Sequence, residues 1–324
     1  MTKYVISGYI GFDNFGDEAI ASVLSNYLKS AGAEKITYLS LNPRKTSEQY
    51  GVNSVSMLKF IKPVLESDVL ISGGGSLLQD ITSLKSLIYY LAVIMTALAF
   101  GKKVFIFAQG FSKFRTKIGK FLTKFVLERC HGISVRDKES QEYLKTLGIE
   151  SELASDPVYA IETPLAEHSG LGVQLRGFRT LTNEFMVNLA DEIARVFPKQ
   201  EIKLLSMQDT VDLPVIDKFA EMLSANGCVP KIIKNINVIE GIFEISKLEY
   251  LIGMRFHACL IASKAGVKTL GINYDNKVKN LSNGVGFPVI NMFGCEVKDG
   301  IKELLKQHPQ TYKIPEFNFP KIIP

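Results

Sequence analysis

Three basic side chains in the C-terminal half have the types and spacing of a site that binds an anion and moves a proton. Arg255 and His257 follow the apolar run Tyr250 to Met254, and Lys277 follows a second apolar run, Val267 to Tyr274. An apolar helical segment lies between the runs, so the pattern predicts strand, turn, helix and strand. Arginine binds carboxylates and phosphates with paired hydrogen bonds, lysine supplies a compact charge, and histidine titrates near neutral pH. The pattern therefore predicts an anion site beyond the carboxyl ends of two strands.

A structural role for the same residues is the alternative. Arg255 would then form an ion pair that stabilises the fold, and His257 would be a buried histidine with satisfied hydrogen bonds. All three basic residues directly follow strand ends, where ligands bind in open α/β sheets, and this favours the functional interpretation.

A glycine-punctuated loop, residues 8 to 18, connects the first expected strand to the first expected helix. It carries Asp13, Asn14 and Asp17, and an acidic loop suits sugar hydroxyls better than phosphates. Its spacing matches neither GxGxxG nor a P-loop, so neither dinucleotide nor triphosphate binding is indicated. Capping of the helix by Asp17 and Glu18 is an alternative that stays open.

Residues that could line a ligand also follow later strands of the N-terminal half. Three consecutive glycines, Gly73 to Gly75, precede Asp80 and allow a close approach of the backbone to a ligand or a neighbouring element. Gln109 ends another strand. Arg136 follows its strand as Arg255 follows its own. The glycines predict a site at this edge and leave the identity of its ligand open.

The 324 residues are enough for two domains that each bury a core. Strands alternate with helical patterns in both halves, which predicts an α/β fold of two Rossmann-like domains facing each other across a cleft. We expect the domains to span residues 1–165 and 166–324, with a linker around 162–170. The tail from Thr311 is rich in proline and aromatic residues and is expected to pack back over the surface.

Composition excludes several classes of protein. The four cysteines and four histidines show no metal-ligand or disulfide spacing, so no metal is expected. A net charge of +5 permits an anionic substrate or membrane surface, and no nucleic-acid-binding motif occurs. The N-terminus leads into a strand rather than a signal peptide, and the run 87–100 is shorter than the about 20 residues of a spanning helix. We therefore expect a cytoplasmic protein.

Residues 113–129 predict an amphipathic helix with a basic face. Its expected inner stripe comprises Phe114, Ile118, Leu122, Phe125 and Val126, and its basic residues are Lys113, Arg115, Lys117, Lys120, Lys124 and Arg129. Such a face usually serves solvation. Peripheral contact with anionic lipid head groups at the inner face of the cell membrane is the alternative, and a membrane-bound substrate would favour it.

Several segments in order resemble the polysaccharide pyruvyl transferase family, over about residues 4 to 288. The segments that carry the resemblance are Gly8-Tyr9-Ile10-Gly11, Asn14-Phe15-Gly16-Asp17-Glu18-Ala19-Ile20, Ile71 to Asp80, Ala108-Gln109-Gly110, Ser134-Val135-Arg136-Asp137, Ser155-Asp156-Pro157-Val158, Leu175-Arg176, Gly253-Met254-Arg255-Phe256-His257 and Tyr274-Asp275-Asn276-Lys277. The ordered set is specific, although no single segment is. Residues 111–113 depart from the Ile-Gly-Pro that is more usual in the family, and this bears on the acceptor. Phe256 replaces the usual leucine.

The resemblance implies a fold similar to GT-B glycosyltransferases, with phosphoenolpyruvate as donor and no further cofactor. The acceptor would be a sugar residue of a cell-surface polysaccharide or its lipid-linked precursor, and the product a cyclic pyruvate ketal. Donor-binding roles carry over to Arg136, Arg255 and Lys277, and a catalytic role to His257. The candidates for the acceptor side, in the N-terminal domain, are Asp13, Asn14, Asp17, Gly74, Asp80 and Gln109.

Two other functions compete with this one. A nucleotide-sugar glycosyltransferase of GT-B type would need an acidic residue on the ribose hydroxyls, for which Asp275 is available. The Arg-x-His arrangement fits a compact, highly charged donor better. A non-catalytic sugar-binding module would have no need for the cluster of Arg136, Arg255, His257 and Lys277.

Overall fold

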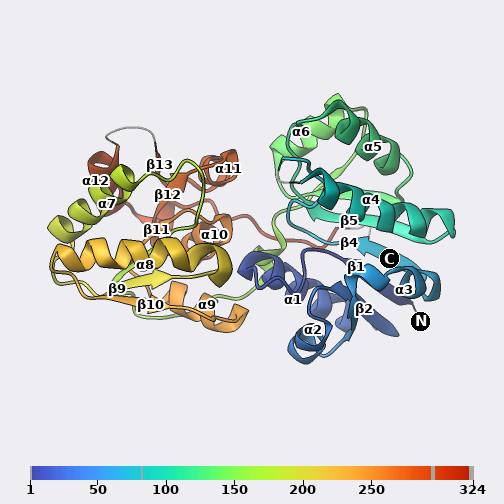
Figure 1. Cartoon of the computed structure of the whole chain (residues 1–324), viewed down its shortest axis with the longest axis horizontal. Coiled ribbons are helices and arrows are strands. Elements are labelled where there is room, and N and C mark those ends of the chain that lie inside the picture. The colour runs from blue at the N-terminus through green and yellow to red at the C-terminus, as the bar shows by residue number, and fades with distance from the viewer. Residues whose placement is uncertain (1, 82, 293–295, 321–324) are drawn as a thin grey trace. The chain divides into compact units, whose positions relative to one another are not determined.

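The structure is a computed structural model that describes residues 2–81, 83–292 and 296–320 (Figure 1). The chain divides into two compact units. Unit 1 comprises residues 2–161 and 316–320 of the described chain, and unit 2 comprises Glu162–Pro315. Each unit is a parallel β-sheet with helical connections, which confirms the prediction of two Rossmann-like domains. The cleft between them stays a prediction.

Within the described chain, unit 1 holds a seven-stranded sheet in the order β3-β2-β1-β4-β5-β6-β7. Its neighbouring strands are all parallel. The strands are β1 (Lys3–Ser7), β2 (Lys35–Ser40), β3 (Asn53–Ser56), β4 (Val69–Ser72), β5 (Lys103–Gln109), β6 (Gly132–Val135) and β7 (Glu152–Leu153). The strand order reverses between β1 and β4, and ligands of open α/β sheets bind at such a switch point.

The helices of unit 1 arise from the apolar periodicity and capping residues of the sequence. They are α1 (Phe15–Ser30), α2 (Pro43–Tyr50), α3 (Ile61–Glu66), α4 (Leu84–Ala99), α5 (Lys117–Leu127) and α6 (Lys138–Thr146), with the 3-10 turns η1 (Met57–Lys59) and η2 (Pro157–Ala160). α4 is the expected core helix, since Leu87, Tyr90, Val93 and Ile94 are buried. Among the described residues, no helix is both long and apolar enough to cross a bilayer.

α5 differs from its predicted amphipathic pattern. Its Thr116 N-cap accepts a hydrogen bond from Gly119 N at 3.0 Å, and the face that packs inward carries Val126 and Leu127. Ile118 and Phe125 were expected on that inner stripe, but both are exposed. The helical period explains the difference, because Ile118 and Phe125 are seven residues apart and share one face, whereas Val126 lies about 100° around the helix from Phe125.

The described part of the C-terminal tail packs on unit 1. The ring of Phe319 stacks on Tyr27, with centroids 3.5 Å apart, and lies 6.0 Å from the near-parallel ring of Phe107. Phe317 meets Phe107 edge-on, and Ser155 Oγ donates to the carbonyl of Glu316 at 2.9 Å. These contacts place residues 316–320 with the N-terminal sheet rather than with unit 2.

Unit 2 holds a six-stranded sheet in its described residues, in the order β10-β9-β8-β11-β12-β13, again with parallel neighbours. The strands are β8 (Leu171–Gln174), β9 (Ile202–Leu205), β10 (Pro230–Ile233), β11 (Tyr250–Gly253), β12 (Lys268–Asn273) and β13 (Val289–Asn291). The helices are α7 (Asn183–Val196), α8 (Asp209–Ala225), α9 (Val238–Ser246), α10 (Phe256–Lys264), α11 (Asn276–Val285) and α12 (Val297–Leu305), with the turn η3 (Pro309–Thr311). Its switch point lies between β8 and β11.

Candidate functional site

Arg136 joins several loops at the carboxyl edge of the sheet of unit 1. Its buried guanidinium donates from Nη1 to Asp156 Oδ2 at 3.2 Å and from Nη2 to Ser76 Oγ at 3.3 Å. A Cβ atom added at Gly110 would lie 2.8 Å from Arg136 Nε, so this glycine leaves the space that the guanidinium occupies. The loops after β4, β5, β6 and β7 therefore meet at one cation.

A β-bulge places Gln109 at the same edge. The register between β5 and β6 shifts between Ile106 and Gln109, and Ala108 has a positive φ of 43°. Ser134 Oγ holds the bulge, because it accepts from Ala108 N at 2.8 Å and donates to the carbonyl of Ile106. A non-glycine residue with positive φ costs about 1–3 kcal/mol and is often found at functional sites.

The carboxamide of Gln109 is buried, and only its nitrogen makes hydrogen bonds within the described chain. Nε2 donates to Ser72 Oγ at 2.8 Å and to the carbonyl of Gly73 at 2.8 Å. Oε1 is also buried, and it accepts no hydrogen bond from the described residues. A buried acceptor without a donor is costly and uncommon, which singles out Gln109 as a candidate functional residue.

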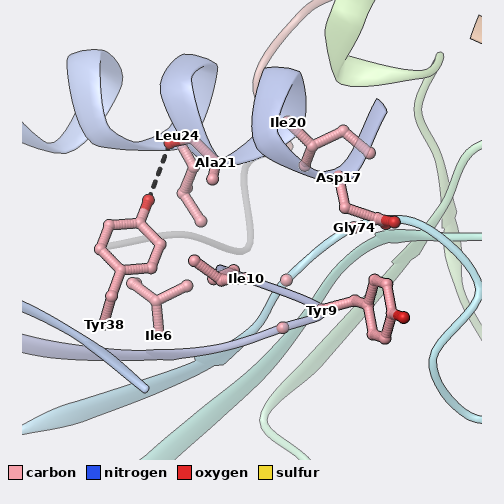
Figure 2. Close-up of a pocket in the computed structure, with 11 residues that line it drawn as sticks. Ile6, Tyr9, Ile10, Asp17, Ile20, Ala21, Leu24, Tyr38 and Gly74 are labelled. Atoms are coloured by element: carbon pink, nitrogen blue, oxygen red, sulfur yellow. Dashed lines mark hydrogen bonds between the residues drawn. The ribbon is translucent and has the colours of Figure 1, made fainter. Parts of the chain in front are cut away.

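Asp17 and Gly74 line a small hollow between β1, β4 and α1 (Figure 2). Figure 2 shows Asp17 and Tyr9 at the same end of the hollow as Gly74. A Cβ atom at Gly74 would lie 2.8 Å from Ile20 Cγ2, and one at Gly75 would lie 2.6 Å from Asp17 Oδ1. The glycines are therefore needed for this close approach, and the structure brings Asp17, Gly74 and Gln109 to one edge.

The start of α1 is capped by Asn14 rather than by Asp17 or Glu18. Asn14 Oδ1 accepts from Gly16 N at 3.2 Å. Glu18 instead holds the preceding loop, since its Oε1 accepts from Gly11 N at 2.8 Å and its Oε2 from the hydroxyl of Tyr50. Burial raises the pKa of Glu18 above its usual value, although these two hydrogen bonds oppose the shift.

Asp13 and Asp80 are engaged away from this edge cluster. The exposed Asp13 has a φ of 56° and pairs with Lys45 Nζ at 2.6 Å. The buried carboxylate of Asp80 accepts from Arg115 N, Thr116 N and Thr116 Oγ1 at 2.6–2.8 Å, which fixes the start of α5. Burial alone would raise the pKa of Asp80, but these hydrogen bonds outweigh it and lower the pKa. Acceptor binding by Asp13 or Asp80 stays a prediction without support from these contacts.

Arg255 forms in unit 2 the buried ion pair that was the structural alternative. Its Nε and Nη2 donate to the two oxygens of Asp212 at 2.9 and 2.6 Å, and the Asp212 side chain is 0% exposed. Gln208 Oε1 accepts from Nη2 at 3.2 Å, and Gln174 Oε1 accepts from Arg255 N at 2.7 Å. The guanidinium is therefore fixed at the β8–β11 switch point.

His257 and Lys277 begin the helices that follow β11 and β12. His257 lies half-buried in the first turn of α10, with the ring of Phe256 edge-on at 5.1 Å. Lys277 is exposed in the first turn of α11, where its backbone N donates to Asp275 Oδ1 at 2.9 Å. β11 and β12 are parallel neighbours, and α10 packs against α11. The structure thus brings Arg255, His257 and Lys277 to one edge of the sheet.

Arg176 is a further cation at this edge that the site prediction missed. It follows β8, and its Nη1 donates to the hydroxyl of Tyr274 at 3.1 Å. Its Nε is buried and makes no hydrogen bond within the described chain. Burial and Asp275 raise the pKa of Tyr274, whereas Arg176 and Arg255 oppose the shift. The available signal was its position directly after a strand, as for Arg136 and Arg255.

Residues 14–276 match the sequence model of the family described as polysaccharide pyruvyl transferase. The chain belongs to the polysaccharide pyruvyl transferase family. The predicted family is thereby confirmed, and membership supports a transferase. None of the curated proteins compared with the chain matches it. In the described part of the chain, no group of three or more His, Cys, Asp or Glu side chains could hold a metal ion.

Solved structures with a similar fold include UDP-GlcNAc 2-epimerases and a protein in complex with UDP and glucose. A putative UDP-N-acetylglucosamine 2-epimerase from Listeria monocytogenes is 11% identical with a TM-score of 0.69, covering 95% of this chain and 89% of its own. UDP-GlcNAc 2-epimerase from Methanocaldococcus jannaschii is 12% identical with a TM-score of 0.68, covering 98% and 96%. An Anabaena protein in complex with UDP and glucose is 10% identical with a TM-score of 0.60, covering 94% and 89%. At such identities the likeness concerns the fold alone, and it confirms the GT-B-like class.

Proposed function

We propose that this transferase moves the pyruvyl group of phosphoenolpyruvate onto two hydroxyls of one sugar residue and forms a cyclic ketal. The acceptor would belong to a cell-surface polysaccharide or to its lipid-linked precursor. The observation that carries the proposal is the gathering of Arg176, Arg255, His257 and Lys277 at one sheet edge, in a chain of this family.

Phosphoenolpyruvate carries a carboxylate and a phosphate on one carbon, so its site must neutralise several negative charges at close range. The first turn of α10 presents backbone N–H groups and a positive dipole to an anion, with His257 and Lys277 at neighbouring helix starts. Arg255, fixed by Asp212, would act as a rigid member of this site, and Arg176 would add a second guanidinium. Arg136 would complete the donor site from unit 1.

The acceptor would bind at the edge of unit 1. Gln109 Oε1 would accept a hydrogen bond from a sugar hydroxyl, since it has no donor among the described residues, and Asp17 and Gly74 line the same hollow. Sugar hydroxyls donate well to such acceptors, and the glycines permit a ring to approach the backbone. Asn14, which caps the start of α1 near Asp17, would contribute from the same loop.

The reaction needs only proton transfers and charge stabilisation from these residues. A proton adds to the methylene carbon, one hydroxyl oxygen bonds to the carbon that carries the phosphate, the phosphate leaves, and the second hydroxyl closes the ring. Of the two protons that the hydroxyls release, one balances the proton taken up by the methylene carbon and the other leaves with phosphate. His257 is the candidate for proton transfer, because imidazole works near neutral pH.

The test is release of inorganic phosphate from phosphoenolpyruvate with a panel of free and lipid-linked glycans, with products identified by mass. His257→Ala should lower turnover by about 100-fold to 10,000-fold, the usual contribution of general acid–base catalysis. His168→Ala, at an exposed histidine of unit 2, is the matched control and should leave turnover unchanged. Near-normal turnover by the His257 variant would remove it from the mechanism.

A nucleotide-sugar glycosyltransferase is the second candidate, favoured by the likeness to solved structures in complex with UDP and sugars. A comparison of thermal stabilisation by phosphoenolpyruvate and by UDP-sugars separates the two. Stabilisation by UDP-sugars alone would favour glycosyl transfer. Failure to release phosphate with every acceptor would favour a non-catalytic sugar-binding module.

A further inference from the structure

The outer face of α5 exposes apolar side chains that a solvated helix does not need. Phe121 is 65% exposed, Ile118 57% and Phe125 38%. The two phenylalanine rings lie 6.5 Å apart, one turn from each other, and the guanidinium of Arg129 lies 3.6 Å from the centroid of Phe125. We call Ile118, Phe121 and Phe125 the outer apolar stripe of α5.

Cations surround this stripe. Lys117 and Lys120 are exposed, Lys124 is half-buried, and Lys113 and Arg115 extend the charge into the preceding loop. Residues 57 to 129 carry eleven Lys and Arg against four Asp and Glu, whereas the whole chain carries 38 against 33. The positive charge of the protein is therefore concentrated in the segment that contains α5.

Neighbouring helices extend the same character. α3 packs against α4, and α4 packs against α5, which lies beside it in Figure 1. Leu58, Ile61 and Leu65 are exposed on η1 and α3, Ile88 is exposed on α4, and Phe100 is exposed at the C-cap of α4. The lysines that lie near them in the sequence are Lys59, Lys62, Lys85 and Lys102. Exposed large apolar residues with lysines near them in the sequence therefore recur on the helices that pack next to α5.

We propose that the outer apolar stripe of α5, with the lysines around it, docks unit 1 on an anionic lipid bilayer. Aromatic and aliphatic side chains insert at the boundary between head groups and acyl chains, while Lys and Arg neutralise the head-group charge. Lysines alone would fit a solvated face, and an apolar stripe alone would fit a protein partner. The combination of both is complementary to an anionic bilayer.

The position of α5 suggests what membrane docking would do for the reaction, and this step of the argument rests on the proposed function. The loop that leads from Gln109 to Thr116 connects the acceptor edge directly to α5, and Asp80 fixes the start of the helix. A docked α5 would therefore hold the acceptor edge close to the bilayer. A lipid-linked sugar presented at the membrane is the acceptor class that this arrangement serves.

The experiment is sedimentation of the full chain with vesicles of phosphatidylcholine and with vesicles of equal parts phosphatidylcholine and phosphatidylglycerol. The protein should bind the second and not the first. Phe121→Ser with Phe125→Ser should weaken binding by more than tenfold, since each ring buries apolar area in the interface. Each of Lys117→Gln and Lys120→Gln should weaken it by about fivefold at low salt, the effect of about 1 kcal/mol per cation.

Phe243→Ser in unit 2 is the matched control, because Phe243 is 44% exposed and Lys247 lies 3.6 Å from its ring centroid, much as Arg129 lies on Phe125. This variant should bind vesicles as the parent does, and all variants should keep the parent's circular dichroism spectrum and unfolding midpoint. The absence of vesicle binding by the parent, or undiminished binding by the double Phe variant, would overturn the proposal. A concentration-dependent association that the double variant abolishes, with vesicle binding unchanged, would assign the stripe to a protein partner instead.

Phosphate release with a soluble acceptor, measured on the same variants, separates the two proposals. Release that persists while vesicle binding by the parent fails leaves the pyruvyl transfer intact and rejects the docking surface. Vesicle binding by the parent without any phosphate release would keep the docking surface and reject pyruvyl transfer.

Discussion

Arg136 and Arg255 occupy comparable positions in the two units, yet their contacts differ. Each follows a short buried strand and lies beside a buried aspartate. Arg255 donates two bonds of 2.9 and 2.6 Å to Asp212. Arg136 donates single bonds of 3.2 and 3.3 Å to Asp156 and Ser76, and its Nε lies 3.6 Å from Asp137 Oδ2. Two arginines that follow strand ends can therefore be held to different degrees, and the geometry of their acidic partners decides how firmly.

The largest expected effect is that of Arg255→Ala on stability. It leaves Asp212 as a buried charge without its cation and should lower the free energy of unfolding by about 3–5 kcal/mol, measured in urea. A loss no larger than that of Arg136→Ala would erase the distinction between the two arginines.

The double variant Arg255→Met, Asp212→Leu sharpens this test. Apolar replacement of a buried ion pair is often neutral for stability, so most of the lost free energy should return. Transfer activity should stay low if Arg255 also contacts the donor. Full recovery of activity would make Arg255 purely structural.

Arg136→Ala should act mainly on the donor. A charge-assisted hydrogen bond contributes about 1.5–3 kcal/mol, so the apparent KM for phosphoenolpyruvate should rise by about 10-fold to 150-fold. Arg136→Ala also leaves the buried Asp156 without its cation, so the free energy of unfolding should fall as well. The fall should be smaller than for Arg255→Ala, because Asp156 accepts one bond of 3.2 Å from Arg136 whereas Asp212 accepts two shorter ones. An unchanged KM, with normal phosphate release, would exclude Arg136 from the donor site.

Arg176→Met tests whether unit 2 has a second ligand-binding arginine. Loss of its guanidinium should raise the KM for phosphoenolpyruvate by about tenfold, the effect of one ionic hydrogen bond. Tyr274→Phe removes only the hydroxyl that Arg176 Nη1 contacts and is the control, for which we expect a smaller change. Equal effects of both variants would show that Arg176 acts only through Tyr274.

The smallest expected effect on stability concerns Glu18. Its buried carboxyl accepts hydrogen bonds from Tyr50 and Gly11 and has, within the described chain, no arginine partner of the kind that Asp212 has in Arg255. Its pKa is raised by burial, so the protonated form is favoured in the folded state. The stability that this provides is present below the unfolded pKa of about 4.3 and is lost as the pH rises through the folded pKa. Glu18→Gln should remove this loss, seen as a flatter dependence of urea midpoints on pH over that window. An identical pH dependence in both proteins would contradict the raised pKa.

Features set by local pattern were predictable from the sequence. Alternating strands and helices indicated two parallel α/β units, and glycines or arginines directly after strands marked the edges where Gly74, Gln109, Arg136 and Arg255 now lie. Those features depend on neighbours in the chain. They need no knowledge of distant contacts.

Partners far apart in sequence could not be predicted. Asp212 lies 43 residues from Arg255, and Asp80 lies 36 residues from Thr116, with no periodicity that links either pair. The apolar pattern of α5 was ambiguous for a different reason. Apolar residues occur on both of its faces, so the pattern alone placed Phe125 inside, whereas packing of Val126 and Leu127 turns it outward.

The packing of Phe319 on Tyr27 and Phe107 determines how the chain connects the two units. The polypeptide passes between the units twice, after residue 161 and before residue 316, so two covalent connections tie them together. Residues 162–315 are therefore an insertion into unit 1, and both ends of unit 2 are joined covalently to that unit. The second connection depends on the contacts of residues 316–320 with unit 1, to which Phe317 and Ser155 contribute beside Phe319.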